Sequence, residues 1–180
     1  MTEIVPVTGP ELVTYADELA ALLVETVEGG SSVGFLAPLG RDAAADWWRG
    51  RAALVEEGDH QVWIARHDER VVGTVDLVRA SLPNARHRAE ITELMVRPSA
   101  RGQGVGRALL TAVERSAAAS GLSLLVLGTE TGGAAEELYR SAGWKQYGAI
   151  PAYAGDPSGA LRATTFYFRV IGPLNALAPQ

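Results

Sequence analysis

The sequence predicts an α/β fold with a central mixed, mostly antiparallel sheet. Residues 91–96 have strand character and precede a glycine-rich loop and an apolar pattern at helical spacing that ends at Gly121. Residues 61–66 and 71–78 alternate as two strands of a hairpin. Residues 122–127 form a continuous apolar run, as expected of a strand that is covered on both faces.

The segment before the hairpin contributes one strand and two helices. Residues 4–7 alternate as a short strand, and a helix follows over residues 10–29. A second helix is predicted over residues 41–57 and carries Trp47 and Trp48 in its middle. Because neighbouring positions lie about 100° apart around a helix, only one of the two tryptophans can point squarely inward.

The last third of the chain supplies the remaining elements. A helix, a strand, a turn-rich loop and a final strand are predicted over residues 134–142, 144–150, 151–159 and 164–171. The prediction is therefore about seven strands flanked by about four helices. No linker or repeat divides the chain, so we expect one domain over residues 1–172 and a C-terminal tail over residues 173–180.

Composition narrows the classes of function. The net charge of −5 gives no overall attraction to nucleic acid or to an anionic membrane. The absence of cysteine excludes a disulfide framework, a thiolate metal site and a cysteine nucleophile. His60, His67 and His87 are scattered, so no metal site is expected. Without a signal-like N-terminus or an apolar run of about 18 residues, a cytoplasmic protein is expected.

The glycine-rich loop between strand and helix has the character of an anion site. Alternating glycines leave backbone N–H groups uncovered, and the start of the helix adds unpaired donors and the positive end of its dipole. Two arginines bracket the glycines and can neutralise a diphosphate. The predicted cofactor-binding residues of this loop are Arg101, Gly102, Gln103, Gly104, Val105, Gly106 and Arg107.

Other uses of a glycine-rich loop fit less well. A Walker loop needs Gly-Lys followed by Ser or Thr, whereas this loop continues Gly106-Arg107-Ala108. A dinucleotide fingerprint needs its third glycine one position later and an acidic residue about 20 residues on. A tight turn without a ligand is the remaining alternative.

The spacing [Gln/Arg]-x-x-Gly-x-[Gly/Ala], met by Arg101, Gly104 and Gly106, resembles the loop of the GCN5-related N-acetyltransferase (GNAT) superfamily. The strand ending Glu93-Leu94-Met95-Val96 precedes it, and a later segment repeats the superfamily's C-terminal motif with Ala135, Leu138, Tyr139, Gly143 and Trp144. The resemblance spans residues 62–171 and implies the GNAT fold, with the pyrophosphate of acetyl-coenzyme A on the loop. Residues 81–89 are locally similar to a subgroup that includes tabtoxin-resistance acetyltransferases.

The resemblance also implies roles for residues of the central strand and the later helix. A backbone N–H of Leu94, Met95 or Val96 would contact the thioester carbonyl, and the pantetheine arm would lie along that strand edge. Tyr139 matches the tyrosine that faces the sulfur of coenzyme A as general acid, and a phenol is protonated at neutral pH.

Two glutamates are candidates for the general base. Glu93 is expected to share one strand face with Ile91 and Met95, where apolar neighbours would raise its pKa; an ordinary solvent-facing or ion-paired glutamate is the alternative. Glu130, at the end of the apolar strand, can bind a cationic amine, share the base role or simply be solvated. Gly132 stands where many members have an asparagine that contacts the cofactor, so that contact is absent.

The expected function is acetyl-coenzyme A dependent N-acetylation by direct attack of a primary amine, with a small molecule such as an antibiotic or toxin as acceptor. Val33, Phe35 and Leu36, in the loop over residues 31–40, either wall a substrate pocket or pack into the core. A protein or peptide N-acetyltransferase and a non-catalytic acyl-coenzyme A sensor remain alternatives. Homodimers are common in the superfamily, so the resemblance allows a homodimer as well.

Overall fold

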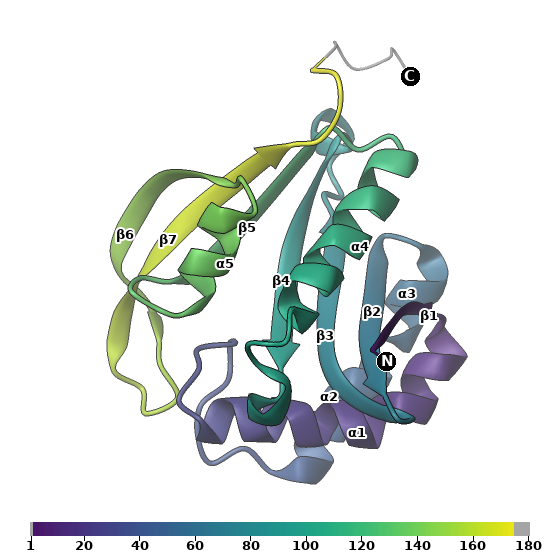
Figure 1. The fold of residues 1–180 in the computed structure, drawn as a ribbon, viewed down its shortest axis with the longest axis vertical. Helices are drawn as coiled ribbons and strands as arrows, with labels where there is room; N and C mark the ends of the chain where they lie inside the picture. Colours follow the sequence, from purple (N-terminus) through teal and green to yellow (C-terminus); the bar gives the residue numbers. More distant parts are fainter. Residues whose placement is uncertain (1, 175–180) are drawn as a thin grey trace.

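The computed structural model describes residues 2–174 and contains one seven-stranded sheet in the order β1-β2-β3-β4-β5-β7-β6 (Figure 1). Only the β4–β5 pair is parallel, and all other neighbours are antiparallel. The predicted fold class, a mixed and mostly antiparallel sheet, is confirmed. The strands are β1 (Glu3–Val7), β2 (His60–His67), β3 (Arg70–Arg79), β4 (Arg88–Val96), β5 (Leu124–Glu130), β6 (Lys145–Gly155) and β7 (Leu161–Val170).

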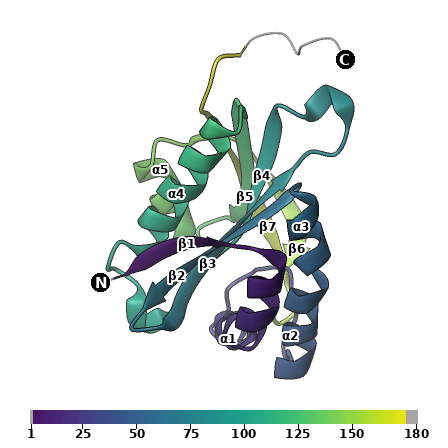
Figure 2. The same ribbon diagram turned by 90° about the vertical axis from the view of Figure 1, so that its right-hand side faces the viewer.

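Helices cover both faces of the sheet (Figure 2). One face carries α4 (Val105–Ala119) and α5 (Ala135–Ser141), and the other carries α1 (Gly9–Glu28), α2 (Arg41–Gly50) and α3 (Ala52–Glu57). Two short 3₁₀ helices lie at Pro83–Ala85 and Pro98–Ala100. No helix among residues 2–174 combines the length and the apolar character needed to cross a membrane.

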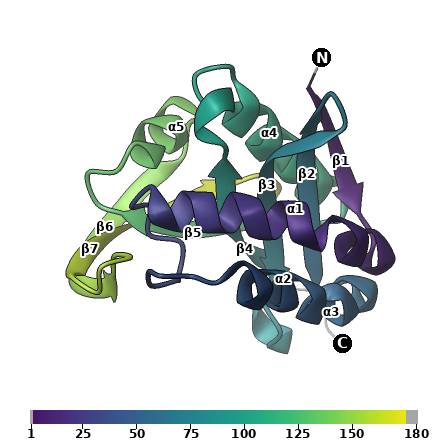
Figure 3. The same cartoon turned by 90° about the horizontal axis from the view of Figure 1, so that it is seen from below.

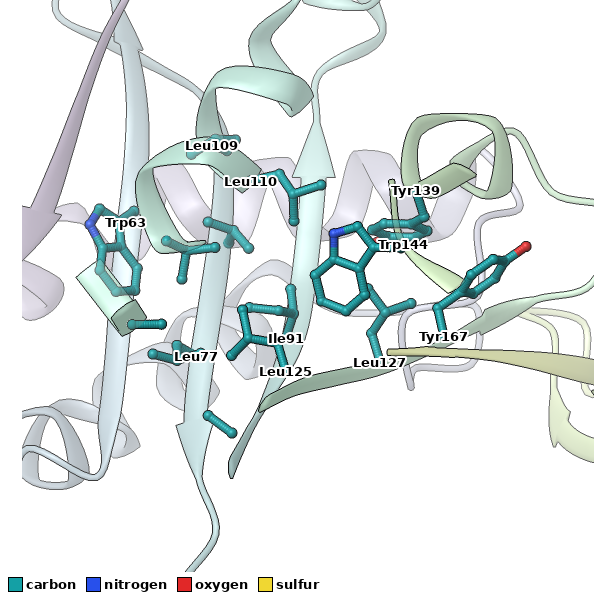
Figure 4. Packing of buried hydrophobic residues seen from close by; sticks show 14 of the residues in the cluster. Trp63, Leu77, Ile91, Leu109, Leu110, Leu125, Leu127, Tyr139, Trp144 and Tyr167 are labelled. Carbon is teal, nitrogen blue, oxygen red and sulfur yellow. The ribbon is translucent and has the colours of Figure 1, made fainter. Parts of the chain in front are cut away.

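Two hydrophobic clusters hold these layers together. Under α4 and α5 the core includes Leu77, Leu109 and Leu125, together with Tyr139 and Trp144 (Figure 4). A second cluster on the opposite face packs α1 and α2 on β2 and β3. As predicted, only one of the paired tryptophans points fully inward: Trp48 is completely buried, whereas Trp47 is half-buried.

β4 and β5 pair only briefly and then diverge (Figure 1). Their register joins Arg88–Glu90 to residues 124–126, after which β5 continues beside β7. Toward its C-terminal end β4 therefore has a strand neighbour on one side only, β3. The backbone on the open side of β4 is available to a ligand.

Two predicted elements differ from those in the structure. The helix predicted over residues 41–57 is interrupted at Arg51, which follows Gly50 and separates α2 from α3. β6 extends to Gly155, through most of the segment predicted as a turn-rich loop, because it pairs with β7 on both sides of an irregularity. The predicted tail over residues 173–180 lies mostly outside the described residues.

The loop between α1 and α2 reaches the β6–β7 connection, far along the chain (Figure 3). The Ser32 hydroxyl donates to the Gly155 carbonyl at 3.2 Å, and the Ala37 N–H donates to the Pro157 carbonyl at 2.8 Å. Within this loop, Phe35 packs edge-on against Trp47. The loop thus bridges the two halves of the sheet on the α1 face.

The start of α1 offers a direct test of local stability. Thr8 and Glu11 form a reciprocal capping box, in which the Thr8 hydroxyl accepts from the Glu11 N–H and the Glu11 carboxylate accepts from the Thr8 N–H. Replacing Thr8 by Ala should cost about 1 kcal/mol of unfolding free energy, which lowers Tm by roughly 2–4 °C for a chain of this size. Thermal unfolding measures this, with Thr14→Ala as the control because Thr14 is exposed and caps nothing. An unchanged Tm for Thr8→Ala would contradict the expectation.

Candidate functional site

The N-terminus of α4 presents unpaired backbone donors. Gly104 caps the helix in a left-handed conformation, and no side chain bonds to the helix start. The first helical hydrogen bond runs from the Ala108 N–H to the Gly104 carbonyl at 2.9 Å, so the N–H groups of Val105, Gly106 and Arg107 lack an intrahelical partner. Gly102 also has a positive φ of 73°, which favours glycine. These groups form the kind of cradle that holds a phosphate.

Side chains of the loop frame this cradle. The Arg101 guanidinium donates to the Val96 carbonyl at 3.1 Å, and that of Arg107 donates to the Ser141 hydroxyl at 2.6 Å. Gln103 is exposed and donates to the Ser99 carbonyl at 2.9 Å. Because the Val105 side chain is buried, Val105 can offer only its backbone.

The direction of each backbone N–H group distinguishes Leu94, Met95 and Val96, the three candidates for contact with the thioester carbonyl. The Arg97 N–H donates to the Val72 carbonyl on the β3 side at 2.8 Å. Since N–H groups alternate along a strand, those of Met95 and Val96 point to opposite sides, Met95 toward β3 and Val96 toward the open edge. Leu94 follows the same alternation as Val96, next to an irregularity in the strand.

Helix α5 brings Leu138, the residue before Tyr139, next to the start of α4. A Cβ added to Gly106 would lie 3.2 Å from the Leu138 side chain, which shows how closely α5 approaches α4 there. Tyr139 is 5% exposed and packs beside Trp144 and Tyr167, with ring centroids 6.0 and 5.9 Å away (Figure 4). Burial raises the pKa of the Tyr139 phenol, so the hydroxyl stays protonated at neutral pH.

Glu93 occupies a β-bulge, which corrects the predicted strand pattern. Asp76 of β3 pairs with Thr92 and Thr74 pairs with Met95, so two residues of β4 lie opposite one residue of β3. Glu93 itself has a φ of 51°. Ile91 therefore packs in the cluster under α4 whereas Met95 packs in the cluster under α1, and the predicted shared face does not exist.

The Glu93 carboxyl is protonated more readily in the folded chain than a glutamate in water. Its Oε2 atom is buried without a hydrogen-bond partner among the described residues. Burial, and secondarily the negative charge of Asp76, raise the pKa of Glu93 to about 7, against an opposing influence of Arg51. A carboxyl with this pKa can accept a proton near neutral pH.

Glu130 and the turn after it lie at the far end of β5. Glu130 is half-buried and pairs across the ladder with Thr164 of β7. In the following turn the Gly132 N–H donates to the Glu136 carboxylate at 2.8 Å, and the Tyr167 hydroxyl donates to the same carboxylate at 2.9 Å. Glu136 thus anchors the turn in which Gly132 stands.

Tyr147 and Tyr153 of β6 and Phe166 and Phe168 of β7 form an aromatic surface. Tyr147 stacks near Phe166 and Phe168, with centroids 5.9 and 6.1 Å away, and Tyr153 meets Phe166 edge-on at 5.0 Å. Both tyrosines are more than half exposed. Since Tyr167 packs under α5, the alternation of β7 places Phe166 and Phe168 on the other face, which the α1–α2 loop approaches. No group of His, Asp or Glu that could hold a metal ion occurs among residues 2–174.

A family model for the acetyltransferase (GNAT) domain matches residues 58–146, nearly half of the chain and the part that contains β4, the glycine-rich loop and Tyr139. This part of the chain is a GNAT domain. The GNAT resemblance deduced from Arg101, Gly104 and Gly106 is thereby confirmed.

Individual relatives agree with this assignment. The chain is 32% identical over 105 residues to an uncharacterized N-acetyltransferase of the hisH–hisA intergenic region of Azospirillum brasilense, covering 57% of this chain and 61% of that protein. It is 41% identical over 69 residues to an IAA acetyltransferase of the same organism, covering 38% of this chain and 45% of that protein. It therefore spans less than two thirds of either relative.

A solved structure matches the whole fold. This is yncA of Salmonella typhimurium, described as a putative acetyltransferase and solved with its cofactor acetyl-CoA. It superposes with a TM-score of 0.77 at 20% identity, over 100% of this chain and 98% of the other. At that identity the likeness establishes the shared fold.

Sequence reasoning missed a cluster of three titratable residues near the bulge of β4. Asp76 and His60 are buried on β3 and β2, and Arg51 lies between α2 and α3 with its guanidinium 4.0 Å from the Trp47 ring centroid. One signal was available: Asp76 is the only charged residue of the predicted strand over residues 71–78, and a charge within an apolar strand needs a partner.

Proposed function

We propose that this chain is an acetyl-CoA-dependent N-acetyltransferase that acetylates the primary amine of a small molecule. The observation that carries the proposal is the meeting of three features at one place: the open edge of β4 at Val96, the uncapped start of α4, and Tyr139 from the adjoining helix. The names of the relatives, all acetyltransferases, support the same reaction.

The residues divide the chemistry among themselves. The N–H groups at residues 105–107, with the side chains of Arg101 and Arg107, would hold the pyrophosphate, and acetyl-CoA supplies an activated acetyl group as its thioester. Glu93 takes the proton from the attacking amine, directly or through water. The N–H of Val96 or Leu94 stabilises negative charge on the carbonyl oxygen, and Tyr139 returns a proton to the departing sulfur. Without a cysteine nucleophile, direct attack by the amine is the simplest mechanism.

The acceptor is inferred from the aromatic surface of β6 and β7 and from two carboxylates on neighbouring strands, Glu93 and Glu130. Tyr147, Tyr153 and Phe166 offer apolar and π surface, on which an aromatic or aliphatic body can pack. Glu93 and Glu130 provide negative charge on the neighbouring strands for the ammonium form of the amine. We therefore favour a small amine with an apolar body over a polyamine that is polar throughout.

Thermal unfolding with and without acetyl-CoA tests the cofactor. At 100 times its dissociation constant the ligand should stabilise the chain by about 2.7 kcal/mol, which is roughly 5–10 °C in Tm. ATP and NADH serve as comparators and should give no comparable shift. A Tm that does not move at millimolar acetyl-CoA would overturn the proposal.

The acceptor class is tested by a matched panel of amines. Mass spectrometry after incubation with acetyl-CoA should show a gain of one acetyl group on arylalkyl amines, with less on polar amines of the same length and on peptides. Preferential acetylation of peptides would identify a protein or peptide N-acetyltransferase. Binding of acetyl-CoA without turnover across the panel would identify a sensor.

A further inference from the structure

Asp76, His60 and Arg51 form a buried cluster of titratable side chains next to the β4 bulge that contains Glu93. The Asp76 carboxylate is fully buried, and its Oδ2 atom lies 2.9 Å from His60 Nε2 and 3.5 Å from Arg51 Nη2. Arg51 Nη2 in turn lies 3.2 Å from His60 Nε2. Two side chains, His60 from β2 and Arg51 from the α2–α3 junction, therefore converge on one carboxylate oxygen of β3.

The sheet register brings this cluster next to the bulge. Asp76 pairs with Val62 on β2 and with Thr92 on β4, so it lies across from the residue that precedes Glu93. His60 is two residues from Val62 and shares its strand face, which places the imidazole diagonally beside Asp76. The break between α2 and α3 at Arg51 directs the guanidinium onto the same group.

Two buried carboxylate oxygens of this region lack a hydrogen-bond partner within residues 2–174. Among the described residues, Asp76 Oδ1 and Glu93 Oε2 are both buried without a hydrogen-bond partner. A buried carboxylate costs several kcal/mol unless it is paired, and two adjacent carboxylates also repel each other. An apolar residue at position 76 would avoid this cost and stabilise the fold more. The presence of Asp76 therefore points to a role other than packing.

We propose that Asp76, held by His60 and Arg51, is a positioning residue that sets the charge environment of Glu93 so that Glu93 can act as a base near neutral pH. Asp76 disfavours the ionised form of Glu93, and Arg51 favours it. The proposal rests on the role of Glu93 in the proposed function.

The charged groups near Glu93 can be named for each element. Asp76 comes from β3, His60 stands behind it on β2, and Arg51 comes from the α2–α3 junction. On β4 itself, Glu90 is exposed three residues earlier. Of these, Asp76 and Arg51 are the two whose charges act on Glu93, and they act in opposite directions.

Because Asp76 and Arg51 carry opposite charges, a pair of variants tests the proposal. In the dependence of kcat/KM on pH, Asp76→Asn should move the acidic limb to lower pH by about one unit, because a like charge is removed. Arg51→Met should move it to higher pH, because the opposite charge is removed. Arg49→Met is the matched control: Arg49 lies on α2 two residues before Arg51, pairs with Asp17 and Asp46, and should leave the limb in place.

A direct titration separates this proposal from the catalytic one. Difference infrared spectra of the carboxyl bands, with Glu93→Gln to assign the Glu93 signal, follow its protonation whether or not the chain turns over. Opposite displacements of that signal in the two variants would support the positioning role even for a chain without acetyltransferase activity. If Asp76→Asn does not fold, Arg51→Met alone decides by the sign of its shift. Displacements in the same direction, or none in folded variants, would overturn the proposal.

Discussion

Glu93→Gln should lower kcat/KM by roughly 100- to 10,000-fold, the range expected for loss of a general base. The amide has nearly the shape of the carboxylate, so the bulge and its φ of 51° should survive the change. Only ionised Glu93 can accept a proton, and its pKa is raised to about 7. The activity of the unmodified chain should therefore fall as the pH drops below about 7, and this acidic limb should vanish in the variant.

Steady-state kinetics from pH 5.5 to about 9 measure both effects. Glu90→Gln is the matched control, since it removes the same charge from an exposed position on the same strand and should leave the profile intact. The response of Tm to acetyl-CoA should be the same in both variants. Undiminished activity in Glu93→Gln would exclude Glu93 as base, and Glu130→Gln would then be the next variant to measure.

Gly106→Val should remove most of the affinity for acetyl-CoA. A Cβ at this position lies 3.2 Å from the Leu138 side chain and 3.7 Å from that of Val96, so a branched side chain must push α5 away from α4. It would also cover the unpaired N–H groups at the helix start. We expect the dissociation constant to rise about 100-fold, which is about 2.7 kcal/mol.

Isothermal calorimetry gives the dissociation constant directly. Overpacking should also cost about 1–3 kcal/mol of stability, so the ligand-induced change in Tm is compared within each variant. Gly40→Ala is the matched control, because Gly40 has a negative φ, open space around its Cβ and a place on the opposite face of the sheet. A dissociation constant unchanged in folded Gly106→Val would show that acetyl-CoA binds elsewhere.

The sequence by itself determined the order of the elements and the superfamily. The spacing of Arg101, Gly104 and Gly106, with Tyr139 further on, was sufficient because these motifs are local and their chemistry depends on backbone exposure and helix ends. The alternating and helical patterns located all seven strands for the same reason, since period 2 and period 3.6 are properties of a single segment.

Tertiary structure decided what surrounds Glu93. The alternation of β4 predicted one shared face for Ile91, Glu93 and Met95, but a bulge depends on how β4 pairs with β3, which no single-strand pattern contains. The convergence of Asp76, His60 and Arg51 likewise requires three segments to be placed side by side. The basicity of a carboxyl depends on burial and on charges close to it in space. For that physical reason the sequence could name the candidate base, and only the folded chain could show what tunes it.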